Sequence, residues 1–167
     1  MFVAVWPPAE VRRMLAALER DERVGIRWTT PAEWHVTLAF LGDVDPGQVA
    51  SALAGLAHPP ATARFEAKVG RLGRDALVVP VAGLDLLAAE VRRCVGGLAQ
   101  RSFDGRAFHG HLTLARVKRP GACSLTGEVL EGEWRVNEVT VVGSRLHPDG
   151  PRYTVTATIP LTAPAAR

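Results

Sequence analysis

The sequence has few of the residues and patterns that mark specialised classes of protein. Its two cysteines, Cys94 and Cys123, are too few for a disulfide framework and do not have the spacing of a metal site. It has no run of 18 apolar residues, so no transmembrane helix is predicted. Met1 leads directly into Phe2-Val-Ala-Val instead of a charged and then apolar leader. We therefore expect a cytoplasmic, monomeric protein that does not associate with a membrane.

Lysine is also scarce, since 18 of the 20 basic residues are arginine. The net charge is +3, and the sequence has no dense basic block of the kind that makes long, non-specific contacts with nucleic acid. Arginine suits bidentate contacts with phosphate, although GC-rich coding bias is an alternative explanation for the ratio. The charge pattern therefore fits a small phosphate-binding site better than an extended nucleic-acid-binding surface.

The sequence does have enough apolar residues, 47% of 167, to bury the core of one domain, and we expect a single domain spanning 1–167. Apolar periodicity and turn residues predict three helices, one ending near residue 21 and the others at 46–57 and 83–100. They predict strands at 2–6, 24–29, 34–41, 62–69, 76–81, 108–117, 135–142 and 152–159. We expect the strands 62–69 and 76–81 to pair across the turn between them. The order of elements gives two similar halves.

The most informative feature is a tetrapeptide that occurs twice, as His35-Val-Thr-Leu38 and as His111-Leu-Thr-Leu114, each followed by alanine. A single histidine in an apolar strand is usually a half-buried, hydrogen-bonded residue, but a matched pair in the two halves indicates an internal repeat. Alternate residues of a strand share one face, so each motif presents an imidazole beside a hydroxyl. The hydrophobic residues between them face a core.

These paired motifs resemble those of the 2H phosphoesterase superfamily. The segments 26–28, 35–42, 111–116 and 144–153 resemble, in the same order, the bacterial and archaeal RNA 2′,3′-cyclic phosphodiesterases, formerly called 2′-5′ RNA ligases. The resemblance implies a bilobal, pseudo-two-fold α+β fold with two curved antiparallel sheets and helices on the outside. One departure is Gly110, where that family usually has proline, and we expect this glycine to loosen the backbone before His111.

The resemblance implies hydrolysis of RNA 2′,3′-cyclic phosphate ends to 2′-phosphomonoesters, with the 3′ oxygen as the leaving group. We expect His35 to protonate that oxygen and His111 to accept a proton from the attacking water, giving a bell-shaped pH profile around neutrality. Thr37 and Thr113 are expected to bind the phosphate oxygens. Arg116 is the added phosphate clamp that the family pattern offers, but in a regular strand it faces away from His111, so a bulge or strand end is required.

The expected partner is an RNA end bearing a 2′,3′-cyclic phosphate, with tRNA fragments among the candidates, and no metal or other cofactor is expected. The same displacement with a 5′-hydroxyl in place of water is expected to give a weak 2′-5′ ligation. Phe2, Trp28 and Tyr153 are candidates for stacking on the base, although an aromatic residue in a strand more often belongs to the core.

Two alternatives remain open at this point. His109 and His111 form an H-x-H pair on one strand face, which together with a carboxylate can bind zinc, so a metal-dependent hydrolase is one of them. The other is a protein that binds RNA ends in a groove between the two halves but has lost its catalytic activity. An assay with and without EDTA distinguishes both from the metal-independent enzyme.

Overall fold

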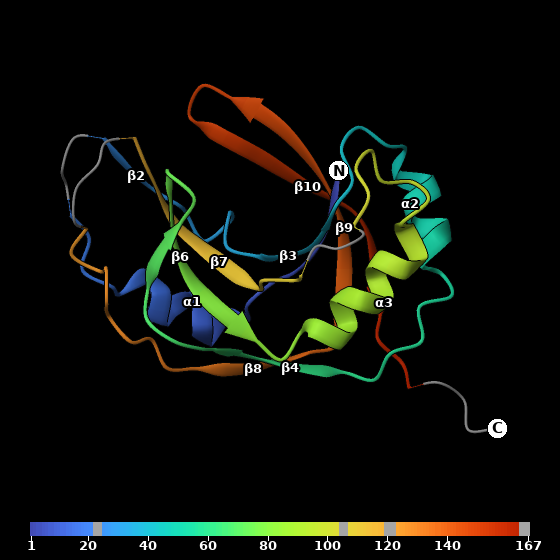
Figure 1. The fold of residues 1–167 in the computed structure, drawn as a ribbon, viewed down its shortest axis with the longest axis horizontal. Helices are drawn as coiled ribbons and strands as arrows, with labels where there is room; N and C mark the ends of the chain where they lie inside the picture. The colour runs from blue at the N-terminus through green and yellow to red at the C-terminus, as the bar shows by residue number, and fades with distance from the viewer. Residues whose placement is uncertain (22–24, 104–106, 119–122, 164–167) are drawn as a thin grey trace.

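The computed structural model describes residues 1–21, 25–103, 107–118 and 123–163. In these residues ten antiparallel strands form one curved sheet, with three helices packed outside it (Figure 1). The main path through the sheet has the order β10-β9-β1-β3-β7-β6-β4-β8, with β2 paired to β7 and β5 paired to β6. The strands are β1 Phe2–Val5, β2 Ile26–Trp28, β3 Val36–Phe40, β4 Ala61–Phe65, β5 Gly70–Leu72, β6 Ala76–Ala82, β7 His111–Val117, β8 Glu133–Val136, β9 Glu138–His147 and β10 Gly150–Pro160. The predicted α+β class is confirmed.

The two motif strands, β3 and β7, lie next to each other in the middle of this order. They are joined by a single residue pair, Val36 with Leu112. On one side of this junction β3 continues to β1, β9 and β10, and on the other side β7 continues to β6, β4 and β8. The sheet therefore consists of two curved halves that meet at the two histidine motifs, which is the arrangement that the repeat in the sequence predicts.

The three helices are α1 Ala9–Ala16, α2 Pro46–Leu53 and α3 Asp85–Val95. Each is shorter than its apolar spacing predicts. The start of α2 follows from its sequence, because Asp45 accepts a hydrogen bond from the Gln48 amide at 3.0 Å and Pro46 occupies the first turn. Beyond the C-terminal end of α1, the Arg20 side chain donates a hydrogen bond to the Leu15 carbonyl. Figure 1 shows α2 and α3 side by side at one end of the sheet.

The predicted pairing of 62–69 with 76–81 is confirmed, but only over two residue pairs and not directly across the turn. β4 ends at Phe65 and pairs with β6 only at Arg64–Ala82 and Phe65–Val81. Ala67 has φ 62°, a left-handed conformation that interrupts the strand. The hairpin across the turn is formed instead by β5, a strand of three residues that the sequence does not predict.

The C-terminal strands also differ from the prediction. The predicted strand 135–142 is divided between β8 and β9, and β9 continues to His147. The segment 144–151 is rich in turn residues, but most of it extends the β9–β10 hairpin, with Gly150 paired to His147. Residue 24, at the start of another predicted strand, lies outside the described residues.

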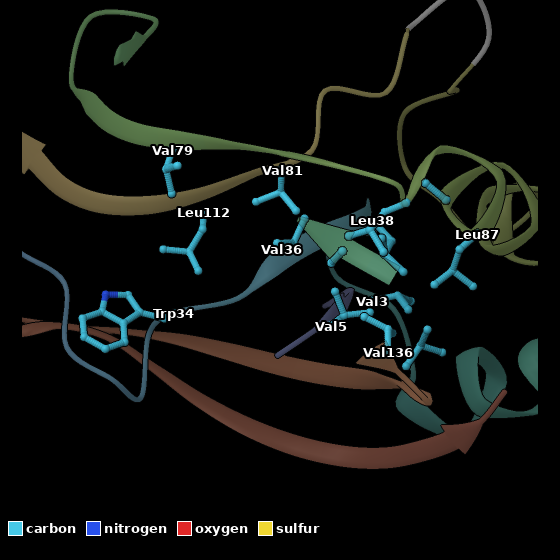
Figure 2. Close-up of a cluster of buried hydrophobic side chains, with 14 of the residues drawn as sticks. Val3, Val5, Trp34, Val36, Leu38, Val79, Val81, Leu87, Leu112 and Val136 are labelled. Carbon is cyan, nitrogen blue, oxygen red and sulfur yellow. The ribbon is translucent and has the colours of Figure 1, made fainter. Parts of the chain in front are cut away.

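The core lies beneath the motif strands. Val36, Leu38 and Leu112 are fully buried and are shown in Figure 2 with Val79 of β6 and Val3 of β1. Val36, Leu38 and Leu112 belong to the motifs themselves. Because neighbouring side chains of a strand point to opposite faces, the histidines and threonines of the motifs lie on the face away from the core. Packing of the core thus determines which side chains lie on the opposite face of β3 and β7, the face of His35, Thr37, His111 and Thr113, which we call the groove.

Candidate active site

Both motif strands contain a β-bulge at the leucine of the motif. In the β1–β3 ladder, Ala4 pairs with Thr37 and Val3 with Ala39, so Leu38 is an extra residue. In the β6–β7 ladder the same shift makes Leu114 an extra residue between Thr113 and Ala115. A bulge of one residue reverses the alternation of the side chains that follow it. The residue two places after each bulge therefore lies on the same face as the histidine and threonine.

These two residues are Phe40 and Arg116. The alanine before each one is buried, whereas Phe40 is 65% exposed and the side chain of Arg116 is 50% exposed. The bulge that Arg116 requires in order to reach the groove is therefore present. The bulge in the first motif likewise brings Phe40 to the groove. Regular alternation of side chains along the strand does not predict this.

The bulges leave carbonyl groups that need partners outside the ladder. The Leu38 carbonyl accepts a hydrogen bond from Nε of Arg92 at 3.0 Å. The Leu114 carbonyl accepts from the amide of Thr29 at 2.9 Å and from its hydroxyl at 2.8 Å. The Thr29 hydroxyl in turn accepts from Nε1 of the buried Trp34 at 2.9 Å. Each bulge is thus stabilised by one specific side chain.

The register between β3 and β7 brings the two motifs together. Because Val36 lies opposite Leu112, continuing the antiparallel register places His35 opposite Thr113 and Thr37 opposite His111. The two histidines are then diagonal neighbours on one face, a relation that separates residues by roughly 7–8 Å. In this register each motif histidine lies opposite the threonine of the other motif.

Both imidazole rings are oriented by the same local contact. Nδ1 of His35 lies 2.7 Å from the carbonyl oxygen of Glu33, and Nδ1 of His111 lies 2.8 Å from that of His109. A carbonyl only accepts hydrogen bonds, so Nδ1 carries the proton in each neutral ring and Nε2 is the basic atom. In the described residues neither Nε2 has a protein partner. Each Nε2 is available to take or give a proton in the groove.

The surroundings of the two histidines differ. His35 lies in a cage of aromatic rings, stacked on Phe2 at 4.8 Å between centroids, with Trp6 at 5.3 Å and the edge of Tyr153 at 5.1 Å. The pKa of His35 is lowered to about 4, chiefly by burial and also by the charge of His111, while the hydrogen bond to the Glu33 carbonyl and the charge of Glu33 act in the opposite direction. His35 is therefore neutral in the free protein at neutral pH.

A basic group of residues lies beyond His35 and Thr113. Arg116 is the cross-strand partner of Arg27 on β2, and Arg27 binds the buried Glu33 carboxylate at 2.9 Å. Arg116 lies 3.7 Å from Asp75. Burial raises the pKa of Tyr153, as does the Glu33 carboxylate, while the two arginines act in the opposite direction. These arginines supply positive charge at this end of the groove.

The predicted aromatic residues have different positions. Phe2 and Tyr153 both contact His35, and Phe2 is buried beneath its ring. Trp28 pairs with Ala115 and donates from Nε1 to the Asp21 carbonyl at 2.8 Å, so it lies on the core side of β2. The structure thus does not bring Trp28 to the groove.

Sequence reasoning missed three residues that lie at the site: Trp6, Arg27 and Phe40. Trp6 and Arg27 come from other parts of the chain, and only the fold reveals their proximity. Phe40 has a signal in the sequence, because it occupies the same position in the first motif as Arg116 does in the second.

His109 does not form part of a metal site in the described residues. In that part of the chain no group of three His, Cys, Asp or Glu side chains is placed to hold a metal ion. Nor is any described helix both long enough and apolar enough to cross a membrane.

Comparisons with known proteins agree with this geometry. The profile of the LigT-like phosphoesterases matches residues 5–74. A protein of Thermus thermophilus named RNA 2′,3′-cyclic phosphodiesterase is 33% identical over 177 residues, covering 93% of this chain and 86% of that protein. A crystal structure of a Thermus thermophilus protein superposes with a TM-score of 0.81 at 27% identity, covering 97% of both chains. Escherichia coli LigT complexed with 3′-AMP gives a TM-score of 0.77 at 25% identity, covering 96% of this chain and 97% of that one.

The relationship extends over nearly the whole chain, and the fold and the paired motifs agree with it. On this evidence the chain belongs to the LigT-like 2H phosphoesterases, in the family of the RNA 2′,3′-cyclic phosphodiesterases.

Proposed function

We propose that this protein hydrolyses RNA 2′,3′-cyclic phosphate ends to 2′-phosphomonoesters, with His35 and His111 as acid and base. One observation carries the proposal: the two motif histidines lie on neighbouring strands, and each binds a backbone carbonyl through Nδ1, which leaves Nε2 without a protein partner among the described residues. A phosphodiester can be hydrolysed by two such groups without a metal, because one accepts the proton of water while the other protonates the leaving oxygen. The relative from Thermus thermophilus bears the name of this activity.

We assign the proton acceptor to His111 and the proton donor to His35. Water attacks phosphorus and gives a proton to Nε2 of His111, the bond from phosphorus to the 3′ oxygen breaks, and Nε2 of His35 protonates that oxygen. His35 must gain a proton before it can donate one. A bound phosphodiester anion beside its ring favours the imidazolium, so the substrate itself prepares the acid.

The remaining groups stabilise charge on the phosphate. The hydroxyls of Thr37 and Thr113 have no hydrogen-bond partner among the described residues, which leaves both able to donate to the non-bridging oxygens. Arg116 adds a positive charge from the end of the groove nearest Thr113. Preorganised donors of this kind act most strongly where negative charge develops in the transition state.

The substrate end is a ribose with a phosphate, and Escherichia coli LigT, whose fold is similar, has been crystallised with 3′-AMP. We expect the RNA to be an end left by cleavage, with tRNA fragments among the candidates. The two halves act together as one domain, since each contributes one histidine and one threonine. With a 5′-hydroxyl in place of water, the same path run on the same residues forms a 2′-5′ linkage.

The proposal is tested with an RNA ending in a 2′,3′-cyclic phosphate, incubated with the purified protein with and without EDTA. We expect hydrolysis that resists EDTA and a product with a terminal 2′-phosphate. His35→Ala and His111→Ala should each lose about 10²-fold or more in kcat, the usual contribution of one acid or base. A predominant 3′-phosphate would reverse the assigned orientation, activity abolished by EDTA would show a metal-dependent enzyme, and wild-type rates in either variant would refute the histidine pair.

A further inference from the structure

A cavity of about 330 Å³ lies beside His111, at the opposite end of the groove from Arg116. The mechanism above uses only His111 and Thr37 of the residues that surround it. Most of the remaining lining residues are aromatic or basic. The remaining residues are Leu38, Phe40, Arg92, Arg101, Ser102, Phe103, Phe108 and His109.

Phe40 lines this cavity, and its ring is exposed to solvent. It is 65% exposed at the end of β3, and the bulge at Leu38 holds it on the same face as His35 and Thr37. In a regular strand it would face the core, where a phenylalanine is usually found. The local structure therefore holds an apolar ring in solvent, directly in line with the catalytic side chains.

Arg92 lies at the centre of a second group of lining residues. Its guanidinium lies 5.3 Å from the centre of the Phe103 ring and 5.2 Å from that of Phe108. Its Nε binds the Leu38 carbonyl, which belongs to the bulge that places Phe40. One arginine therefore contacts two aromatic rings of the cavity and the backbone of the bulge that places the third. Aromatic rings together with arginine are the side chains that bind nucleobases in single-stranded RNA.

We propose that this cavity binds the first nucleoside of a second RNA, whose 5′-hydroxyl takes the place of water in the reaction. The inference rests on the proposed function and on His111 as the proton acceptor. In-line displacement puts the attacking group on the side of His111 and the ribose of the cyclic phosphate on the side of His35. The cavity lies on the attacking side and is continuous with His111, so a base stacked on Phe40 brings the adjoining 5′-hydroxyl towards Nε2.

The reaction that this subsite serves is balanced without a cofactor. The 5′-oxygen forms a bond to phosphorus and gives its proton to His111, while the bond to the 3′ oxygen breaks and that oxygen takes a proton from His35. The product is a 2′-5′ phosphodiester with a free 3′-hydroxyl. The cyclic phosphate supplies the energy of the new bond.

The test lets water and a 5′-hydroxyl compete for the same phosphorus. One RNA ends in a 2′,3′-cyclic phosphate, a second carries a 5′-hydroxyl below its saturating concentration, and the ratio of ligated to hydrolysed product is measured. This ratio is independent of the amount of active protein, so a partly unfolded variant still gives a valid result. Stacking of one base on one aromatic ring is worth on the order of 10-fold in binding. We therefore expect Phe40→Ala and Phe40→Leu to lower the ratio about 10-fold.

Two controls separate stacking from other effects. Phe40→Tyr keeps a ring and should retain the ratio, and Leu86→Ala removes another exposed apolar side chain, 77% exposed on α3, outside the cavity. An acceptor RNA that lacks its first base should lower the ratio of the wild type by the same factor as Phe40→Ala. The two losses should not add, because both remove the same contact.

The outcomes are distinct. A ratio that Phe40→Ala leaves unchanged, additive losses with the abasic acceptor, or hydrolysis without any ligated product would each overturn the inference while the proposed hydrolase stands. A higher KM for the cyclic-phosphate RNA with an unchanged ratio would also overturn it, because the cavity would then hold the base of the substrate. No hydrolysis by the wild type would overturn the proposed function itself.

Discussion

At the scale of single residues, the two motif histidines share their sequence context and their Nδ1 contact but not their surroundings. The sequence predicts the imidazoles and the threonines beside them, because both depend only on the alternation of a strand. It does not predict the aromatic cage, since Phe2, Trp6 and Tyr153 come from opposite ends of the chain. Burial by these rings, and not the motif, makes His35 a weaker base than an ordinary histidine.

The titration of His35 can be followed by NMR. Its pKa in the free protein should be about 4. His111→Gln should raise that pKa, because the charge of His111 lowers it. Inorganic phosphate should raise it as well, since a nearby anion favours the imidazolium. Titration of His35 near 6.5, the ordinary value for histidine, would show that the cage does not exclude water from the ring.

The two threonines should act on the transition state more than on binding. Thr37→Val and Thr113→Val keep the shape of the side chain and remove one donor to the phosphate. We expect each to lower kcat by about 10- to 1,000-fold, as loss of one oxyanion donor does, with a smaller change in KM.

Thr37→Ser and Thr113→Ser keep the hydroxyl and serve as matched controls, which should recover most of the activity. A loss confined to KM would show that the hydroxyls bind the ground state only.

At the scale of elements, the decisive feature is the bulge in each motif strand. The sequence predicts both strands, and strict alternation then places Arg116 on the core side. The structure reverses this by one extra residue at Leu114, and a bulge has no fixed signature in a single sequence. The supporting contacts are also non-local, because Thr29 and Arg92 lie far along the chain from the carbonyls that they bind. The motif was therefore predictable from alternation alone, whereas Arg116 was offered only by the family resemblance, and the bulge that turns it to this face was not predicted.

Gly110 has a different role from the loosening that the sequence suggests. Its carbonyl accepts a hydrogen bond from the Val81 amide at 2.8 Å. A Cβ atom at this position would lie 2.3 Å from the Val81 carbonyl oxygen and 3.1 Å from the Phe108 ring. The glycine therefore allows a close approach between the segment before β7 and the end of β6, and this contact fixes the backbone one residue before His111.

Gly110→Ala tests this contact. The added methyl group must push the backbone away from Val81, so we expect a loss of about 1–3 kcal/mol in the free energy of unfolding, as in other overpacked sites. Because His111 follows directly, kcat should fall as well.

Gly97→Ala is the matched control, since a Cβ atom at that glycine meets nothing within 4 Å. Unchanged stability and activity in Gly110→Ala would show that this approach is not tight in solution.

At the scale of the whole molecule, the order of elements and the two-part sheet were predictable because the repeat and the apolar periodicity recur along the chain. The errors are at places where local and non-local preferences conflict. β4 stops early because Ala67 adopts a left-handed conformation, and the short β5 takes its place in the hairpin. The segment rich in turn residues after Gly143 becomes strand because β9 and β10 pair along their length.

The pH dependence of the reaction belongs to the whole groove, because two histidines from different halves of the molecule must hold one proton between them. When both rings are charged no base remains, and when both are neutral no acid remains. The profile of kcat/KM reports the free protein, and its limbs are properties of the pair, not of either residue. Since the pKa of His35 is lowered to about 4, the acidic limb should lie near pH 4 instead of just below neutrality.

This limb can be measured as kcat/KM for a cyclic-phosphate RNA from about pH 3.5 upward, with circular dichroism at each pH to verify folding. Tyr153→Phe keeps the ring beside His35 and should retain the low limb, whereas Tyr153→Ala opens the cage to water. Hydration favours the charged imidazole, so the limb of Tyr153→Ala should move to higher pH. A limb near about pH 6 in the wild type would contradict the burial of His35, and a limb that does not move in Tyr153→Ala would show that Phe2 and Trp6 suffice to keep water from the ring.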